Sequence, residues 1–271
     1  MVANGPLAGR DLRWLMEHHG RELLGEAKAM AGRFPLLVKL LDAREKLSLQ
    51  VHPPAKTAAQ LGGDPKTEMW YIADATPDAE LFVGLKTGVT REEFEEKVRK
   101  GTVADCFHRV HVTAGDAMFL PSGRVHAIGS GLVIFEIQQN SDTTYRVFDW
   151  NRVGLDGKPR PLHITESLAS IDFDDFEPRL VSRLGRTQNH LEHRRLADDP
   201  LFTVEAITAK APGSITVASR LGIVGVVEGK VAGGGGSRSI ELAKGQFCLV
   251  PAAVEAELSL EPATTLLLVR A

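Results

Sequence analysis

The chain has 271 residues, 43% of them hydrophobic, which is enough to bury the cores of two small all-β domains. Its 32 basic and 35 acidic residues give a formal net charge of −3, which excludes a broad basic surface for nucleic acid. No apolar run could cross a bilayer, residues 1–5 lack a secretory layout, and Cys106 and Cys248 have no CxxC motif. We therefore expect a cytoplasmic protein with no membrane or nucleic-acid partner.

The first predicted element is an N-terminal helix. Between Leu7 and Met30 apolar residues recur at helical spacing, with charged residues between them. After Gly32 the pattern changes to short strands, which we expect at residues 34–41, 47–52, 69–72 and 80–83. Pro53 and Pro54 end the second of these strands because proline cannot donate to a sheet.

A short charged helix interrupts the strands. Residues 90–93, Thr-Arg-Glu-Glu, form a capping box, which predicts that a helix begins there. Gly101 is its expected end, since glycine adopts the left-handed conformation that closes helices. We assign this helix to an insertion of about residues 84–112.

Strand patterns resume after the insertion. Strands are expected at residues 117–120 and 132–138, bounded by glycine and proline turn signals. The polar stretch Thr187–Pro200 is interpreted as a connector, and short strands with glycine turns follow it to the end. Many short strands with such turns predict a mainly β chain of barrels or sandwiches.

A faint internal repeat suggests two similar domains. Gly115–Gly123 aligns with Gly245–Ala253 at an offset of 245 − 115 = 130 residues. The same offset places His126 opposite Ala256, so the second copy lacks that histidine. A chance match between two Gly-to-Pro strand patterns is the alternative. We predict a metal-binding catalytic domain with its connector over residues 1–196 and a metal-less domain over residues 197–271.

Four side chains could form one metal site. Gln50 and His52 lie two apart on an expected strand and share a face, Glu68 begins another strand, and His126 follows a turn. Two imidazoles, a carboxylate and an amide oxygen suit one Zn²⁺, with Mn²⁺, Fe²⁺ or Co²⁺ as alternatives. Spacing alone does not choose this set, because other histidines are equally available on composition, among them His108 and His111.

Three segments resemble the signatures of type I mannose-6-phosphate isomerases, a family of cupin proteins. These segments are residues 34–54, residues 66–75, and residues 115–127 continuing into 136–150. Weaker likeness extends the resemblance over most of residues 4–175. It implies two cupin-type, jelly-roll β-barrels. It also implies an aldose–ketose isomerase that interconverts mannose 6-phosphate and fructose 6-phosphate through a metal-assisted cis-enediol.

The resemblance assigns the site residues one by one. It matches the zinc ligands of the family to Gln50, His52, Glu68 and His126. Arg146 matches an active-site arginine whose fixed charge suits an enediolate, although a structural pair with Asp142 or Asp149 is the alternative. Lys66 matches a lysine proposed to assist proton transfer, and Glu136 an acidic residue that acts as a base or an orienter. Lys39, Ser48 and Arg152 match positions around the phosphate or the sugar.

Two departures from the family pattern bear on function. Relatives usually carry further strands before the match to Asn4, so we expect either a first barrel with fewer strands or a chain that begins inside a longer protein. Arg124 stands where relatives usually have a small residue, and it is expected to narrow the pocket or alter sugar choice. The alternatives are therefore a cupin acting on another sugar phosphate, a redox cupin if iron is bound, or a catalytically silent sugar-phosphate-binding protein. The expected oligomeric state is monomer or homodimer.

Overall fold

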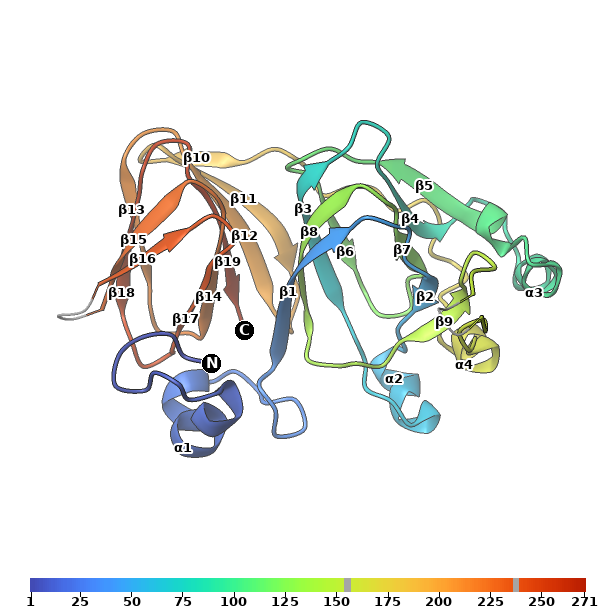
Figure 1. Cartoon of the computed structure of the whole chain (residues 1–271), viewed down its shortest axis with the longest axis horizontal. Helices are drawn as coiled ribbons and strands as arrows, with labels where there is room; N and C mark the ends of the chain where they lie inside the picture. The colour runs from blue at the N-terminus through green and yellow to red at the C-terminus, as the bar shows by residue number, and fades with distance from the viewer. Residues whose placement is uncertain (154–156, 236–238) are drawn as a thin grey trace. The chain divides into compact units, whose positions relative to one another are not determined.

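Antiparallel sheets dominate the computed structural model, which describes residues 1–153, 157–235 and 239–271 (Figure 1). Contacts divide the chain into two units, one of Leu37–Val181 and the other of Met1–Leu36 together with Ser182–Ala271. This division differs from the predicted one, because the N-terminal segment groups with the C-terminal strands. No helix in the described ranges combines the length and apolarity needed to span a membrane.

The N-terminal helix explains this grouping. Helix α1 (Leu12–Leu24) begins where the Asp11 carboxylate accepts a hydrogen bond from the Trp14 amide, and it ends at Gly25. It is thus shorter than the predicted Leu7–Met30 pattern. The amide of Ala252 donates to the carbonyl of Leu23, and a neighbouring pair repeats this contact one residue away. The orphan carbonyls at the helix end are therefore satisfied by the C-terminal chain.

The central unit contains two facing sheets. Their strand orders are β1-β8-β3-β6 and β5-β4-β7-β2-β9. The strands are β1 (Leu36–Ala43), β2 (Leu49–Val51), β3 (Glu68–Ala75), β4 (Glu80–Leu85), β5 (Phe107–His111), β6 (Ala117–Leu120), β7 (His126–Ile128), β8 (Leu132–Gln139) and β9 (Tyr145–Phe148). One core cluster takes residues from both sheets, among them Trp70, Ile134 and Leu81, so it fills the space between them.

The described part of the unit has five short helices, and four of them, all except α2 (Ala55–Ala58), pack against the other face of the five-stranded sheet. The five are α2, η1 (Ala59–Leu61), α3 (Arg91–Lys100), η2 (Val103–Cys106) and α4 (Ile164–Ser170). A second core cluster joins Val51 and Phe82 of that sheet to Phe94 of α3. Apolar side chains therefore alternate along the strands between the inter-sheet core and the helix-covered face.

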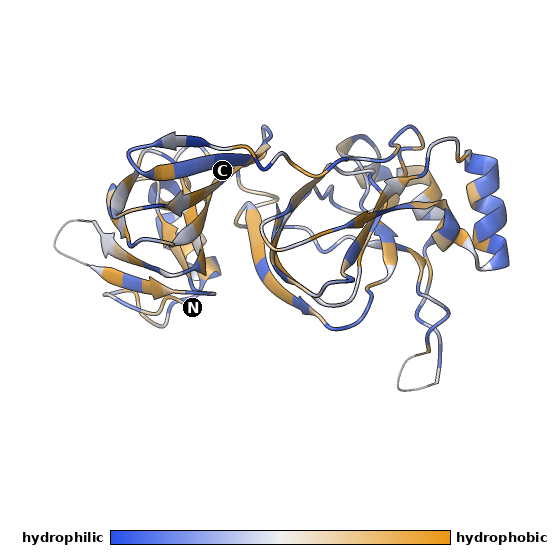
Figure 2. Ribbon diagram, turned by 90° about the horizontal axis from the view of Figure 1, so that it is seen from above, coloured by the Kyte–Doolittle hydropathy of each residue, from blue (hydrophilic) through white to orange (hydrophobic). Residues whose placement is uncertain are grey.

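Helix α3 begins at the predicted N-cap, Thr90, and ends at the predicted Gly101. The Thr90 hydroxyl accepts a hydrogen bond from the Glu93 amide at 3.2 Å, and Gly101 ends the helix with φ of 70°. Phe94 is fully buried and Val98 packs beside it against the same core, whereas the other side chains of α3 are charged and largely form ion pairs four residues apart. The helix is accordingly hydrophilic apart from these two apolar residues (Figure 2, right). The predicted insertion also contains strand β5, which the capping box could not reveal.

The second unit has the same two-sheet plan. Its sheets have the orders β10-β11-β12-β19-β14-β17 and β13-β18-β15-β16. The strands are β10 (Arg186–Gln188), β11 (Leu191–Asp198), β12 (Thr203–Ala209), β13 (Gly213–Val217), β14 (Gly222–Glu228), β15 (Lys230–Gly234), β16 (Ile240–Ala243), β17 (Phe247–Val250), β18 (Ala256–Leu260) and β19 (Thr265–Arg270). Its core cluster is built from aliphatic side chains.

The internal repeat coincides with equivalent strands. β6 and β17 are separated by the predicted 130 residues, and each pairs with a matching strand, β3 or β14. The turns before them use the same bond: Asp116 Oδ2 accepts from the Thr113 amide, and Gln246 Oε1 accepts from the Ala243 amide, both at 2.8 Å. Ala256, the counterpart of His126, lies buried in the aliphatic core.

The prediction of a connector at residues 187–200 is wrong. Strands β10 and β11 occupy most of it, and β11 pairs with β12 along its length. A bulge between Arg195 and Ala197 places Leu196 and Ala197, which are consecutive in sequence, both in buried positions. This bulge breaks the period-two alternation by which a strand is detected in sequence.

Candidate metal centre

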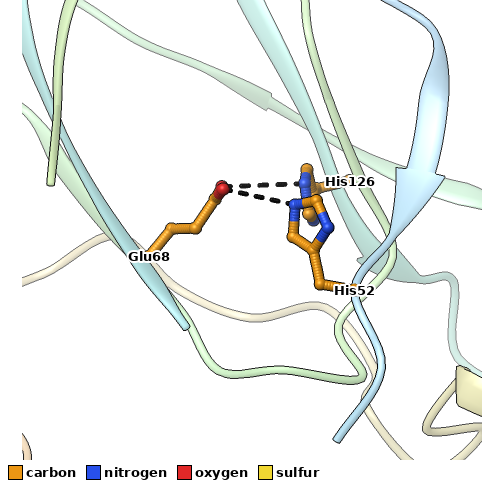
Figure 3. A group of neighbouring side chains, drawn as sticks. All are labelled: His52, Glu68 and His126. Carbon is orange, nitrogen blue, oxygen red and sulfur yellow. Dashed lines mark ion pairs between the residues drawn. The ribbon is translucent and has the colours of Figure 1, made fainter. Parts of the chain in front are cut away.

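Three buried ligand groups converge inside the central unit. His52 directly follows β2, Glu68 begins β3 and His126 begins β7, so the three come from both sheets. One possible ligand atom from each lies within 4.8 Å of the others (Figure 3). His52 Nε2 is 3.2 Å from Glu68 Oε1, and His126 Nε2 is 3.8 Å from Glu68 Oε2. Each residue is only 1% exposed.

The far side of each imidazole is held by a backbone carbonyl. His52 Nδ1 donates to the Thr143 carbonyl and His126 Nδ1 to the Arg124 carbonyl, both at 2.9 Å. A carbonyl can only accept, so each Nδ1 carries a hydrogen, and Nε2 is the ring atom left to face Glu68 and to serve as a metal ligand in the neutral ring. Among the described residues, His52 Nε2 and both Glu68 oxygens have no hydrogen-bond partner. Converging buried atoms left without partners fit a bound metal ion.

The electrostatics of the triad favour the protonation states that metal ligands require. Burial acts to raise the pKa of Glu68, but the charges of His52 and Lys66 outweigh it and hold that pKa well below its usual range. Burial lowers the pKa of His126 to about 3, and the nearby His52 adds to this effect. At neutral pH the carboxylate is therefore ionised and the His126 imidazole neutral, as in a site ready for a divalent cation.

The fourth predicted ligand lies beside the triad. Gln50 pairs with His126 across β2 and β7, and its Nε2 lies 3.2 Å from His126 Nε2. The Gln50 amide carries Oε1 and Nε2 on the same planar group, so rotating that group by a half-turn places the oxygen, an acceptor, where Nε2 now lies. The structure thus brings together the four residues that the resemblance matched to metal ligands. His111, by contrast, is exposed on β5.

Two lysines and a glutamate extend this polar group: Lys39 on β1, Glu136 on β8 and Lys66 two residues before β3. Lys66 Nζ lies 3.0 Å from Glu68 Oε1, an ion pair without hydrogen-bond geometry. Lys39 Nζ donates to Glu136 Oε1 at 2.7 Å and to Gln138 Oε1 at 2.6 Å. Burial and the charge of Glu68 raise the pKa of Glu136, against the opposing effect of Lys39.

Sequence reasoning missed two members of this polar group. Trp70 Nε1 donates to Glu136 Oε2 at 3.1 Å, and Gln138 is fully buried. In the β3–β8 register Trp70 faces Glu136 and Glu68 faces Gln138, so the four side chains share the sheet face that carries Glu68 of the triad. The alternation of residues 136 and 138 on β8 was the signal that could have revealed Gln138.

Arg146 lies on β9 directly opposite Gln50. Residues opposite each other on paired strands share a face, so Arg146 lies on the same face of the sheet as Gln50. Its Nη1 donates to the Pro161 carbonyl at 2.8 Å, while its Nε is buried without a hydrogen-bond partner in the described ranges. Burial and the charge of Arg160 lower the pKa of Arg146. The alternative pairing with Asp149 is not observed.

Asp149 instead binds two other arginines. Its carboxylate accepts from Arg160 at 2.5 and 2.8 Å and from Arg152 Nη2 at 2.6 Å, and Arg152 Nη1 donates to the Lys46 carbonyl. These residues line a hollow of about 380 Å³ that no triad residue lines. Arg152 therefore lies apart from the triad, whereas Ser48 is buried two residues before Gln50.

Asp149→Asn is expected to make the protein less stable in a pH-dependent way. Hydrogen bonds from Arg160 and Arg152 lower the pKa of Asp149 from 3.8 to about 2. The stabilisation is thus fully present above about pH 4 and is lost as the pH falls through about 2. Because both arginines are partly exposed, we expect a loss of about 1–2 kcal/mol near neutral pH. Urea unfolding of both proteins measures this difference, and a difference that does not shrink below pH 4 contradicts the assignment.

Comparison with known proteins places this site in a family. Residues 2–87 match phosphomannose isomerase type I, catalytic domain. The chain is 36% identical over 256 residues to mannose-6-phosphate isomerase ManA of Bacillus subtilis, a match covering 93% of this chain and 79% of that protein. The chain belongs to the type I phosphomannose isomerase family. It is also 38% identical over 205 residues to mannose-6-phosphate isomerase of Streptococcus mutans, covering 75% of this chain and 63% of that protein.

Solved structures agree with the family assignment and confirm the cupin fold. The crystal structure of mannose 6-phosphate isomerase from Bacillus subtilis superposes with a TM-score of 0.88 at 30% identity. That match covers 99% of this chain and 84% of the other. A mutant phosphomannose isomerase from Salmonella typhimurium shares the fold at 17% identity, with a TM-score of 0.73 over 96% of this chain and 85% of the other.

Proposed function

We propose that the chain interconverts mannose 6-phosphate and fructose 6-phosphate by moving a proton between C2 and C1 through a cis-enediol. The observation that carries this proposal is the buried triad of His52, Glu68 and His126 in a chain of this family. A divalent ion held by these residues and Gln50 would supply Lewis acidity for the carbon acid and charge stabilisation for the enediolate. The donor set suits Zn²⁺ first, with Mn²⁺, Fe²⁺ or Co²⁺ as alternatives.

Lys66 is our candidate for moving the proton. It is 5% exposed and its ammonium lies 3.0 Å from Glu68 Oε1, so it stands directly beside the triad that would hold the ion. Glu136 is better suited to orient its neighbours than to act as a base, because Lys39 and Trp70 already occupy its two oxygens. Arg146, on the same sheet face as Gln50, is proposed to stabilise the enediolate by its fixed charge.

Lys39 is our candidate for holding the substrate phosphate or sugar. Its side chain is 36% exposed although its ammonium is fixed by Glu136 and Gln138, so an incoming anion can reach a positioned cation. Roles for Ser48 and Arg152 at the phosphate, the expected monomer or homodimer and the expected cytoplasmic location stay predictions.

Turnover with metal added back tests the proposed function. The metal-stripped protein is expected to be inactive and to regain conversion of mannose 6-phosphate to fructose 6-phosphate on adding Zn²⁺, as followed by NMR. Glucose 6-phosphate and ribose 5-phosphate serve as matched substrates. Metal binding without turnover of any substrate would instead indicate a sugar-phosphate-binding protein, and turnover of another substrate alone would indicate a different isomerase.

A further inference from the structure

The Arg124 carbonyl sets the direction of one triad imidazole. Arg124 follows the turn at residues 121–123 and precedes β7 by two residues. Its carbonyl accepts from His126 Nδ1 at 2.9 Å, while the opposite nitrogen of that ring faces Glu68. A shift of this carbonyl would therefore rotate the imidazole and move Nε2 relative to the other ligand atoms.

The Arg124 side chain ties its own loop in place. Nε and Nη2 donate to the two oxygens of Asp175 at 2.8 and 2.7 Å, a bidentate pair in which both side chains are 16% exposed. Nη1 donates to the Phe119 carbonyl at 2.7 Å, at the other end of the turn. One guanidinium thus joins the end of β6, the start of β7 and the segment after α4.

The same loop is bonded to the backbone of the second histidine. The Gly123 amide donates to the His52 carbonyl at 2.8 Å, and the Asp172 amide donates to the Gly123 carbonyl at 2.9 Å. Gly123 has φ of 97° and a side chain there would lie 3.3 Å from the Ser170 carbonyl, so the turn packs closely on the end of α4. Asp175 is itself fixed, since its carbonyl accepts from the Leu85 amide.

We propose that Arg124 and Asp175 form a positioning pair that orients His126 and thereby increases metal affinity. Arg124 does not need to contact the substrate for this role, in contrast to the expectation that it narrows the pocket. The guanidinium of Arg124 already donates its hydrogen bonds to the Asp175 carboxylate and the Phe119 carbonyl. The inference rests on the proposed function only in requiring a metal at the triad, whichever sugar phosphate is turned over.

Zinc affinity of conservative variants tests the pair. Arg124→Lys keeps the charge but cannot form the bidentate contact, and Asp175→Asn keeps the size but loses the charge. Each is expected to weaken zinc binding about 10- to 100-fold in chelator competition. The double variant should bind zinc about as tightly as the single variant with the lower affinity, because both substitutions remove the same interaction. Arg195→Lys is the matched control, since Arg195 pairs with Asp198 on the surface of the other unit.

Hydrogen exchange of the metal-free proteins gives a second readout. Peptides covering residues 119–126 should exchange faster in both variants, while thermal unfolding shows whether each is folded. Zinc affinity within twofold of wild type in the folded variants overturns the proposal. An equal loss of affinity in Arg195→Lys also overturns it. Neither readout uses mannose 6-phosphate. The positioning role of Arg124 and Asp175 can therefore fail while the isomerase activity stands, and the isomerase activity can fail while the positioning role stands.

Discussion

His126→Ala is expected to abolish zinc binding and turnover of mannose 6-phosphate together. His126 is 1% exposed and closes the triad opposite Glu68, so its removal leaves one imidazole and one carboxylate, with the weakly coordinating amide of Gln50, to hold the ion. Loss of Lewis acidity removes several kcal/mol of transition-state stabilisation, which corresponds to a rate lower by a factor of about 10³ or more. Metal content and turnover at saturating substrate measure the two losses on the same samples.

His111→Ala is the matched control for this prediction. His111 is exposed on β5 and was equally available as a ligand on composition alone. It should keep full zinc content and turnover. If His126→Ala keeps one zinc per chain, or if both variants lose activity equally, the triad is not the metal site.

The candidate metal site was predictable because the family resemblance selected its residues from among those that short strand and turn patterns made available. The alternation around Gln50 and His52 gives a shared strand face, and the turn before His126 places a strand start there. These short patterns, strengthened by the family resemblance, led to side chains that meet within 4.8 Å. The 130-residue repeat was equally readable, because a strand and its preceding turn keep the same spacing in both units.

Which carboxylate pairs with which arginine was not predictable when the two residues lie far apart in the sequence. Asp149 was considered as a partner of Arg146, but Arg160 supplies a better-placed guanidinium and only the folded segment after β9 shows this. Arg124 is another example, because its partner Asp175 lies 51 residues away with no periodic pattern to connect them. Hydrogen bonds of this kind depend on where loops pack, and loop packing leaves little trace in composition or alternation.

Arg146→Ala is expected to lower kcat by about 10²–10³ while zinc affinity stays unchanged. The Arg146 guanidinium lies on the sheet face of Gln50, and its Nε is buried without a partner among the residues described. Such an atom costs stability unless a ligand uses it, which argues for contact with a negatively charged substrate or intermediate. Kinetics at saturating zinc, with zinc affinity measured separately, check the prediction.

Arg146→Lys separates charge from geometry at the same position. The Arg146 amide donates to His163 Nδ1 and the side chain donates to the Pro161 carbonyl, so the arginine is held by a segment that Asp149 fixes through Arg160. A lysine keeps the charge, but one ammonium cannot donate to the Pro161 carbonyl and also direct a second N–H toward the substrate. Arg146→Lys should therefore restore less than a tenth of the kcat lost in Arg146→Ala. Arg195→Ala, on the exposed surface of the other unit, should leave kcat unchanged. A loss of zinc affinity in Arg146→Ala would mean that this arginine supports the metal site and does not act on the enediolate.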